Sequence, residues 1–387
     1  MAFFSKKESF IGLDIGTSSI KIVELVRDGK TGVRLSTYAS AKSSLSLYKS
    51  GDGDSVAKVA TIAHEMLRRS GASATSTVAA LPSLSVFSTV ISLPEMSERD
   101  LEKAVVLAAK NYVPTPLKDV VLGWTVMKEL SNVSKNSVST ESMAPNEPNI
   151  APKGGNVKDE NVENKARRQL ARRNSEIFLT AASKDLVQNY SSVIEHLNLS
   201  LVALEIESFP LSRSLLGTSK EPALLVDIGD LATNFSIVDN GYLRINQSAD
   251  VGGDVITKTI AAKLSISEED AEQRKYKLGL TQDGGDDGLA TATKTVIKDI
   301  IDRGTNLRRI FERKSNRSVA KTILIGGGAN LKGLAEYWAE VSGISTEVGN
   351  PWKGIKVPPI LNNKLLAIGP SFAVAVGLAL REFEQSE

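Results

Sequence analysis

Small hydroxylated residues beside an aspartate open this chain, and they could bind a phosphate. Residues 11–21 (IGLDIGTSSIK) predict a buried strand, a sharp turn at residues 16–19 and a second strand. In such a turn the backbone N–H groups and the side-chain hydroxyls can face one anion. Asp14 stands at the mouth of the turn, where a carboxylate beside a phosphate requires a cation, most simply hydrated Mg²⁺. The same stretch is also typical of a plain hairpin, so its interpretation depends on the rest of the chain.

The pattern of strand, Asp-x-Gly turn and return strand occurs a second time, in residues 224–247. There Asp227 and Gly229 follow an apolar run and precede a second strand. An internal repeat of this kind predicts two duplicated subdomains that face each other across a cleft. We therefore expect Asp14 and Asp227 to converge on one metal ion.

A third motif, in residues 322–331 (TILIGGGANL), predicts a parallel strand that runs into three glycines and a helix. Glycines at this place allow a flat ligand to lie directly on the backbone, and a helix N-terminus favours anions. Because glycine-rich turns between a strand and a helix are common, this motif indicates a binding site only in combination with the two Asp-x-Gly turns.

Composition narrows the remaining classes of function. The length of 387 residues predicts two or more domains, and 41% apolar with 24% charged residues is typical of a soluble globular protein. A net charge of +2 provides no field that would recruit nucleic acid. The chain has no cysteine, which excludes disulfides and thiolate zinc sites, and its two histidines, His64 and His196, leave little for Ser-His-Asp catalysis.

Hydropathy predicts a cytoplasmic protein. The first ten residues (MAFFSKKESF) lack the apolar core of a signal peptide. The most apolar run, residues 365–380, is short for a membrane span. It fits a buried helix that Pro370 begins, because proline is favoured in the first helical turn.

Between the two Asp-x-Gly turns, the pattern of elements changes from about residue 84. Strand-like runs at 86–93, 120–130 and 176–182 and a helix over 97–113 predict a small α+β module. Residues 131–172, inside this module, contain no aromatic side chain and many polar ones. We expect that segment to be a disordered loop, because it cannot bury enough surface to offset its ordering entropy.

Together the three motifs resemble the nucleotide site of the actin-like ATPase superfamily of actin, Hsp70 and sugar kinases. DIGTSSIK is similar to the phosphate-1 motif, DIGDLATN to phosphate-2 and IGGGANLKGL to the adenosine motif. Within that superfamily, four further segments resemble the PilM family of type IV pilus assembly proteins and its relative FtsA: FIGLDIGTSSIKIVEL, NYVPTPLKDVVLGWTVM, IESFPLSRSLL and VGGDVITKTIA. The resemblance spans nearly the whole chain.

The resemblance implies an α/β fold of two actin-like domains, each built on a five-stranded RNase-H-like core. It also implies an inserted α+β subdomain, called 1C in the FtsA and PilM branch. The expected limits are 1–83 and 200–220 for the first subdomain (1A) and 84–199 for the 1C insert with its loop 131–172. The second domain (2A/2B) is expected over 221–363, and residues 364–387 form a C-terminal helix that returns to 1A and an acidic tail.

Carried over by position, the resemblance assigns roles to individual residues. Asp14 and Asp227 would hold Mg²⁺ through water, and Glu207 would orient an attacking water. The remaining residues would bind ATP: Thr17, Ser18, Ser19 and Lys21 at the β- and γ-phosphates, Gly229 and Thr233 in the second phosphate loop, Glu272 and Lys275 at the ribose and adenine, and Gly326, Gly327, Gly328 and Asn330 under the adenosine. The small Thr-Ser-Ser turn and a third carboxylate at Asp230 favour ATP binding with weak or no hydrolysis.

The function implied by the resemblance is an ATP-binding cytoplasmic scaffold of a type IV pilus or competence pilus, held at the inner face of the membrane by its partners. The main partner would be the cytoplasmic N-terminal peptide of a PilN-like membrane protein, in a groove formed by residues 86–93 and 97–113. That helix could equally well only cover its own sheet. Other pilus platform or motor proteins and a second copy of the chain are further expected partners, and nucleic acid is not.

Two alternatives stay open. An FtsA-like cell-division protein typically bears a C-terminal amphipathic membrane helix, whereas this chain ends in the short acidic segment EFEQSE. A small-molecule kinase of the same superfamily needs a general-base aspartate in an insert, and no strong candidate for it is present.

Overall fold

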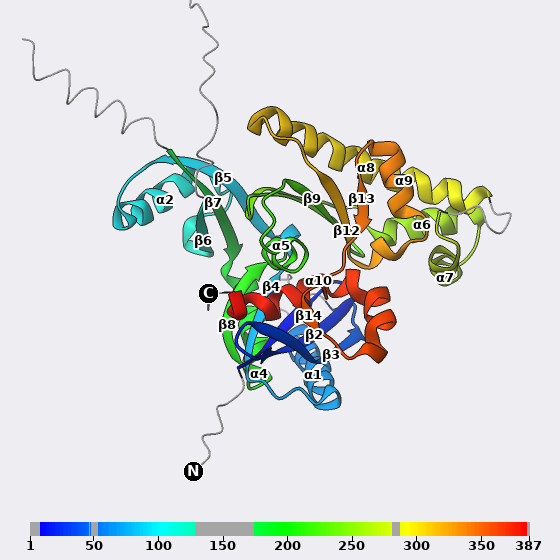
Figure 1. The fold of residues 1–387 in the computed structure, drawn as a ribbon, viewed down its shortest axis with the longest axis horizontal. Helices are drawn as coiled ribbons and strands as arrows, with labels where there is room; N and C mark the ends of the chain where they lie inside the picture. Colours follow the sequence, from blue (N-terminus) through cyan, green and yellow to red (C-terminus); the bar gives the residue numbers. More distant parts are fainter. Residues whose placement is uncertain (1–7, 46, 48–52, 128–173, 281–286, 385–387) are drawn as a thin grey trace, which may run out of the picture.

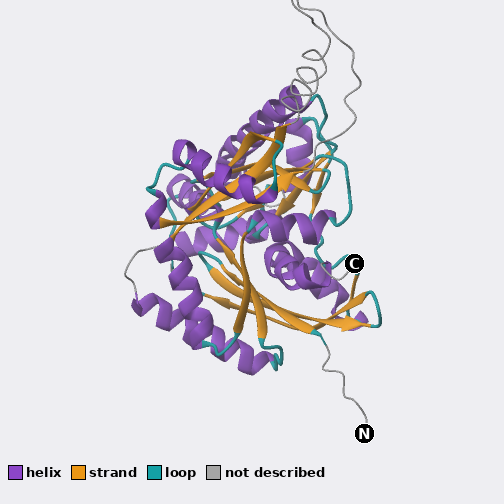
Figure 2. Ribbon diagram, turned by 90° about the vertical axis from the view of Figure 1, so that its left-hand side faces the viewer, coloured by secondary structure: helices purple, strands orange, loops and turns teal. Residues whose placement is uncertain are grey.

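The computed structural model describes residues 8–45, 47, 53–127, 174–280 and 287–384. Figure 1 shows two α/β units, the first below and the second at the upper right, with a smaller sheet at the upper left, above the first unit. Figure 2, turned by 90°, shows the strands of the two units as separate layers with helices around them. The predicted segment 131–172 lies outside the described residues.

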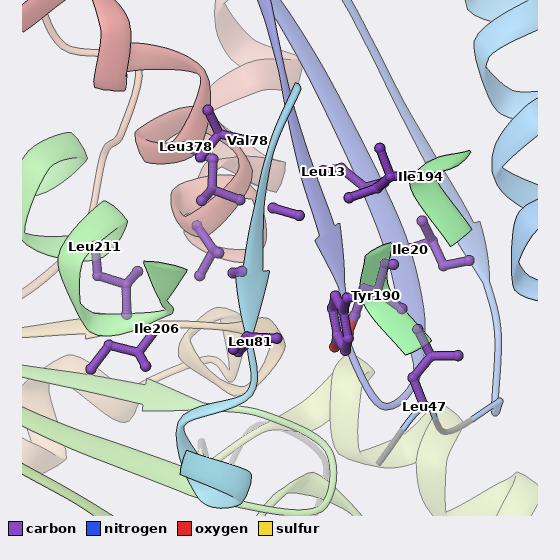
Figure 3. Packing of buried hydrophobic residues seen from close by; sticks show 14 of the residues in the cluster. Leu13, Ile20, Leu47, Val78, Leu81, Tyr190, Ile194, Ile206, Leu211 and Leu378 are labelled. Carbon is purple, nitrogen blue, oxygen red and sulfur yellow. The ribbon is translucent and has the colours of Figure 1, made fainter. Parts of the chain in front are cut away.

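The first unit is a six-stranded sheet in the order β14-β3-β2-β1-β4-β8. Strands β1 (Ser9–Ile15), β2 (Ser19–Asp28) and β3 (Gly32–Lys42) form an antiparallel meander, while β4 (Ser76–Leu81) and β8 (Ser200–Ile206) run parallel to β1. Helices α1 (Gly53–Ser70) and α4 (Lys184–His196) pack on each other and on the sheet, as do α5 (Ser208–Leu216) and α10 (Asn362–Glu384). Figure 3 shows side chains of β1, α4 and α10, among them Leu13, Tyr190 and Leu378, within the core of this unit.

The second unit repeats the topology of the first. Its sheet has the order β11-β10-β9-β12-β13, in which β9 (Ala223–Ile228), β10 (Thr233–Asp239) and β11 (Tyr242–Ala249) are antiparallel. Strands β12 (Lys321–Ile325) and β13 (Thr346–Val348) run parallel to β9. This matches β3-β2-β1-β4-β8 strand for strand, so the predicted duplication of a five-stranded core is confirmed. Helices α6 (Gly253–Leu264), α7 (Glu268–Leu278), α8 (Asp287–Ser315) and α9 (Leu334–Ser342) complete this unit around its own apolar core.

The predicted α+β insert forms the third sheet, in the antiparallel order β5-β7-β6. The 3₁₀ turn η1 (Ser83–Ser85) leads into β5 (Val86–Pro94), and η2 (Leu117–Asp119) leads into β6 (Val120–Met127), while β7 is Asn174–Ser183. Helix α2 (Glu98–Tyr112) begins at the predicted cap, since the Ser97 side chain accepts a hydrogen bond from the Asp100 N–H. Its buried Val105 and Ala109 pack with Ile177 of β7, so α2 covers its own sheet.

Packing moves two of the expected domain limits. Helix α4, expected inside an insert that ends at residue 199, packs on α1, and its Tyr190 and Ile194 belong to the core of the first unit. We therefore place the end of the insert at Ser183. Strand β14 (Ile355–Lys356), expected in a second domain that ends at residue 363, pairs with β3 of the first sheet. The second unit consequently ends before β14.

Helix α10 does not begin at Pro370 as predicted. It follows the turn η4 (Pro359–Leu361) and begins at Asn362, with Pro370 inside it. Proline inside a helix removes the hydrogen bond to the carbonyl four residues earlier, here that of Leu366, which is 54% exposed as a residue. The helix is long and apolar enough to cross a membrane, but 61% of its apolar window is buried inside the protein.

Close backbone contact explains how α10 fits into the core. A Cβ on Gly12 of β1 would lie 1.9 Å from the carbonyl oxygen of Ala375, and a Cβ on Gly377 would lie 1.9 Å from that of Pro210. Only glycine permits either approach. Helix α10 is thus a core helix that packs between β1 and α5.

Candidate functional site

A cavity of about 180 Å³ lies between the two units and brings the three sequence motifs together. Its wall contains the turn after β1, the turn after β9 and the glycines after β12. The predicted site residues that line it are Asp14, Thr17, Ser18, Ser19, Lys21, Glu207, Asp227, Gly229, Lys275, Gly326, Gly327 and Gly328. Asp230, the second carboxylate of the second turn, also lines the cavity.

The two Asp-x-Gly turns have the same local geometry. The Gly16 N–H donates to the Ser19 carbonyl at 3.0 Å, and the Gly229 N–H donates to the Ala232 carbonyl at 2.9 Å. In the strand pairs that flank the turns, Asp14 lies opposite Lys21 and Asp227 lies opposite Asn234. Each turn therefore presents an aspartate and a hydrogen-bond donor from neighbouring strands at the same end of its sheet.

Three of the carboxyl groups in this cavity, those of Asp14, Glu207 and Asp227, act on one another. Burial and the charges of Asp227 and Asp14 raise the pKa of Glu207 to about 8. Burial and the charge of Asp14 also raise the pKa of Asp227 to about 6, although Lys21 acts in the opposite direction. The Lys21 ammonium lies 3.3 Å from the Asp14 carboxylate. The cluster therefore favours a bound proton or a cation over three free charges.

These carboxyl oxygens fit a hard divalent cation such as Mg²⁺, which prefers oxygen ligands and keeps several waters. Among the residues that the structure describes, no group of three His, Cys, Asp or Glu side chains is arranged to hold a metal ion. These carboxyl groups therefore fit an ion that is also coordinated by water and by oxygens of a bound molecule. They fit an ion coordinated by protein atoms alone less well.

The glycines after β12 form the wall beside Asp227. Gly326 has φ +81°, and a Cβ there would lie 2.4 Å from Asp227 Oδ1. A Cβ on Gly328 would lie 2.4 Å from the Ile228 side chain. The helix expected directly after the glycines is instead the short 3₁₀ turn η3 (Gly327–Asn330), and α9 begins only at Leu334. This part of the cavity is therefore formed by the backbone of the glycines, and the N-terminus of α9 does not contribute to it.

Three predicted residues lie outside the cavity wall. Thr233 is fully buried and its hydroxyl donates to the Val251 carbonyl at 2.7 Å. Its counterpart in the first unit is the buried Ile20, which explains why this strand position points inward. Asn330 is exposed at the end of η3. Glu272 instead pairs with the buried Lys275 ammonium at 2.5 Å.

Sequence reasoning missed Asn234, which lines the cavity at the position that Lys21 occupies in the first unit. Its side-chain NH₂ donates to Glu207 Oε2 at 3.1 Å, and the Ser83 N–H donates to the same oxygen at 2.9 Å. The Asn234 carbonyl oxygen accepts from the Ser248 hydroxyl at 2.6 Å. Aligning DIGTSSIK with DIGDLATN would have identified this residue.

A second cavity of about 670 Å³ lies between β8 and the insert. Residues 201–206 of β8 and 121–125 of β6 line it, together with Phe178 and Phe209. Glu205 at this cavity receives two hydrogen bonds of 3.0 Å from Arg213 and one of 2.9 Å from Arg381.

Of the residues 86–93 and 97–113 that were predicted to form the partner groove, Val86 lines this cavity and the others do not. Besides Val86 at the start of β5, the insert lines the cavity mainly with residues 121–125 of β6. Strand β5 instead contacts β11 of the second unit, where the Asn246 amide donates to the Ser88 hydroxyl at 3.1 Å. Helix α2 does not line the cavity, because its apolar face packs on the sheet of the insert.

The duplicated cores with a cavity between them and an α+β insert in the first define an actin-like protein of the FtsA and PilM type. Solved structures of the same fold include the ethanolamine utilization protein EutJ from Carboxydothermus hydrogenoformans, with a TM-score of 0.53 and 16% identity over 96% of this chain and 89% of that one. MreB5 of Spiroplasma citri bound to AMPPNP has a TM-score of 0.50 and 12% identity over 98% and 96%.

The chain belongs to the PilM family of type IV pilus assembly proteins, whose family model matches residues 12–166 and 164–383. It is also similar to the PilM-PilN type IV pilus biogenesis complex, with a TM-score of 0.74 and 25% identity over 96% of this chain and 98% of that one. The cell division protein FtsA of Bacillus subtilis (strain 168) is 26% identical over 145 residues, 36% of this chain. That match covers 31% of FtsA, so it spans about a third of this curated relative. The chain accordingly has a role in type IV pilus assembly.

Proposed function

We propose that this protein is a nucleotide-binding scaffold of the type IV pilus machinery that recruits the cytoplasmic tail of a PilN-like membrane protein. The nucleotide-binding part of this proposal rests on one observation. Two equivalent Asp-x-Gly turns and the glycines at residues 326–328 line the same cavity. Backbone N–H groups of the turns, the Thr17, Ser18 and Ser19 hydroxyls and the Lys21 ammonium supply donors for phosphate oxygens. MreB5, which shares the fold, is known with AMPPNP.

Magnesium and ATP would bind the cavity together. Asp14 and Asp227 would hold Mg²⁺ through water, and the ion would neutralise the phosphates and the carboxyl groups that now repel one another. The glycine backbone at residues 326–328 leaves room for a flat base, because it carries no side chains. Lys275 and Tyr276 line the same cavity from the second unit.

Binding of a fluorescent ATP analogue in the presence of Mg²⁺ tests the proposed nucleotide site. Asp14→Ala and Asp227→Ala should each lower the affinity at least tenfold, because each removes a carboxylate from the metal position. Asp54→Ala is the matched control, since Asp54 is an exposed carboxylate paired with Lys58 on α1. Equal binding by all four proteins, or no binding by the wild type, would contradict a nucleotide site.

We expect hydrolysis to be weak or absent. Burial is the largest cause of the raised pKa of Glu207, and it acts in the nucleotide-bound protein as well, where it disfavours the ionised carboxylate that a general base requires. One of its oxygens is already occupied by the Ser83 and Asn234 donors. Phosphate release measured at pH 7 with saturating Mg-ATP should therefore stay far below one turnover per second, and sustained faster release would make the protein a working ATPase.

The second half of the proposal rests on the similarity to the PilM-PilN complex and on the cavity between β8 and β6. Most of the residues that line this cavity are apolar, and Thr125, Thr180, Ser191, Glu205 and Arg381 add polar groups to its wall. A bound tail of a PilN-like protein would hold the scaffold at the cytoplasmic face of the membrane. Other pilus components and a second copy of the chain could then bind the remaining surface.

Two aspartate substitutions distinguish this cavity from the helix α2. Val202 on β8 lines the cavity and is 39% exposed, whereas Leu107 on α2 is 65% exposed and lies outside it. Val202→Asp should abolish binding of a synthetic PilN N-terminal peptide from the same organism, measured by fluorescence anisotropy. Leu107→Asp should leave that binding unchanged. The reverse result would move the partner to α2.

A further inference from the structure

Among the large apolar side chains that the structure describes, Ile360 is the most exposed. It lies in the turn η4 before α10 and is 91% exposed, and Leu366 near the start of the helix is 54% exposed. The preceding Pro358 and Pro359 are exposed as well. We call residues 358–366 the η4 tip, and they line neither of the two cavities described above. Because single exposed apolar residues are common on protein surfaces, the meaning of this tip depends on what surrounds it.

Buried neighbours hold the η4 tip in place. The Leu361 N–H closes the turn on the Pro358 carbonyl at 2.9 Å, and the Leu361 side chain packs against the core that α10 shares with β2 and β3. The Trp352 indole N–H donates to the Leu365 carbonyl at 2.8 Å, and both residues are buried in that core. Ile360 therefore projects from a turn that is anchored on both sides.

The stretch of sequence around the tip carries positive charge only. Residues 348–381 contain no aspartate or glutamate, whereas Lys353, Lys356 and Lys364 lie in this stretch and are exposed. Lys364 follows Ile360 by four residues within one continuous helical run, which places both side chains on the same face. The apolar tip is therefore accompanied by cations.

Neighbouring strands change this charge little. Arg34 lies opposite Lys356 in the pair of β3 with β14, and the Asp28 carboxylate lies 3.1 Å from the Lys356 ammonium. The side chains of this ion pair are 39% and 71% exposed, so water weakens their interaction. This side of the first unit thus keeps an excess of positive charge, although the net charge of the whole chain is only +2.

We propose that the η4 tip contacts the surface of an anionic lipid bilayer directly, with Ile360 among the lipid chains and the three lysines at the headgroups. An apolar side chain that projects from a convex turn can enter a bilayer without a prepared pocket, and lysine stems extend from the apolar layer to the anionic headgroups. A protein partner would have to supply both a pocket for Ile360 and anions around it. Strand β14 is the edge of the first sheet opposite β8, so this surface is separate from the cavity proposed for the partner tail. The contact goes beyond the proposed function, in which the tail holds the protein at the membrane.

Vesicle flotation with the full chain tests the contact. The protein should bind vesicles of about 30% phosphatidylglycerol in phosphatidylcholine, and its affinity for pure phosphatidylcholine should be at least about tenfold lower. Raising the salt from about 50 to 500 mM should also lower the affinity about tenfold, because exposed charges are screened. Inorganic phosphate at the same ionic strength should not compete, since it offers no apolar layer.

Point variants assign the binding to the tip. Ile360→Asp should lower the affinity for the anionic vesicles at least about tenfold, and Lys353→Ala and Lys364→Ala about three- to fivefold each. Leu107→Asp is the matched apolar control, because Leu107 is 65% exposed on α2. Lys314→Ala is the matched charge control, because Lys314 is exposed at the end of α8. Both controls should bind the vesicles as the wild type does.

A fluorescent probe shows independently whether the tip enters the bilayer. The chain has no cysteine, so Ile360→Cys introduces a single thiol for an environment-sensitive fluorophore, and Leu107→Cys introduces a matched one on α2. On the anionic vesicles, the probe at residue 360 should become brighter and emit at shorter wavelength, because it leaves water. The probe at residue 107 should not change.

The proposal is wrong if the wild type does not bind the anionic vesicles, or if each control variant loses as much affinity as the corresponding variant of the tip. Binding of the PilN N-terminal peptide, measured on the same proteins, should be equal for Ile360→Asp and the wild type. If the peptide binds and the vesicles do not, the membrane contact fails and the partner assignment stands. If the vesicles bind through the tip and the peptide does not bind, the partner assignment fails and the membrane contact stands.

Discussion

Replacing Glu207 by glutamine should stabilise the nucleotide-free protein at alkaline pH. The Glu207 carboxyl is buried beside Asp227 and Asp14, and these surroundings raise its pKa from 4.5 to about 8. Glutamine has the same shape, carries no charge, and keeps an oxygen that can accept from the Ser83 N–H and the Asn234 amide. The substitution therefore removes the unfavourable ionisation and retains the local hydrogen bonds.

The size and sign of the effect follow from proton linkage. Below pH 4.5 the carboxyl is neutral in both the folded and the unfolded protein, and the penalty is absent. As the pH rises toward 8, the unfolded chain releases the proton while the folded protein retains it, so the folded state loses stability. The full cost is about 5 kcal/mol, of which about 3 kcal/mol is incurred between pH 5 and pH 8.

Urea unfolding in the presence of a chelator measures this effect. The three tryptophans report on the three parts of the molecule, because Trp124 lies in the insert, Trp338 in the second core and Trp352 in the first unit. The free energy of unfolding of Glu207→Gln should exceed that of the wild type by an amount that grows by about 3 kcal/mol from pH 5 to pH 8.

Glu65→Gln is the control for this experiment. Hydrogen bonds from Arg68 and Arg69 lower the pKa of the exposed Glu65 to about 2, so its replacement should produce no gain that grows with pH. Parallel stability curves for the wild type and Glu207→Gln from pH 5 to pH 8 would refute the reasoning, because they would show that Glu207 ionises freely in the folded protein.

Three further outcomes are expected. Gly326→Ala should abolish Mg²⁺-dependent nucleotide binding, because its Cβ would lie 2.4 Å from Asp227 Oδ1. Gly354→Ala is the control, since Gly354 has a similar φ of +82° and no neighbour within 4 Å. This control should cost only about 1–2 kcal/mol of stability in urea unfolding. Arg317→Ala should cost about 3–5 kcal/mol in the same assay, because it leaves the buried Asp239 carboxylate without its cation, and a loss below 1 kcal/mol would contradict that pairing. Mg-ATP should flatten the fall of the wild-type melting temperature between pH 5 and pH 8, because the cation replaces the proton among the carboxyl groups.

Some features of the site could be predicted because they depend only on the residue pattern of short stretches of chain. The alternation of apolar residues before Asp14 and Asp227, and the small residues after them, specify a strand and a tight turn without help from distant residues. Their recurrence predicted two cores and a shared cavity, and the duplicated strand order is present. The same repeat also contained the pairing of Lys21 with Asn234, which was overlooked.

Other features depend on contacts between residues far apart in the sequence. Sheet order in the insert, β5-β7-β6, decides that β6 borders the cavity beside β8. Packing against α1 decides that α4 belongs to the first unit, and contact with Gly12 decides where α10 lies.

By itself, then, the sequence determined the family, the duplicated cores and most of the residues around the central cavity, because turns and strand periodicity are local properties. Only the tertiary structure decided which elements line each cavity and how the buried carboxyl groups perturb one another. Those properties arise from the distances and the burial that long-range packing creates.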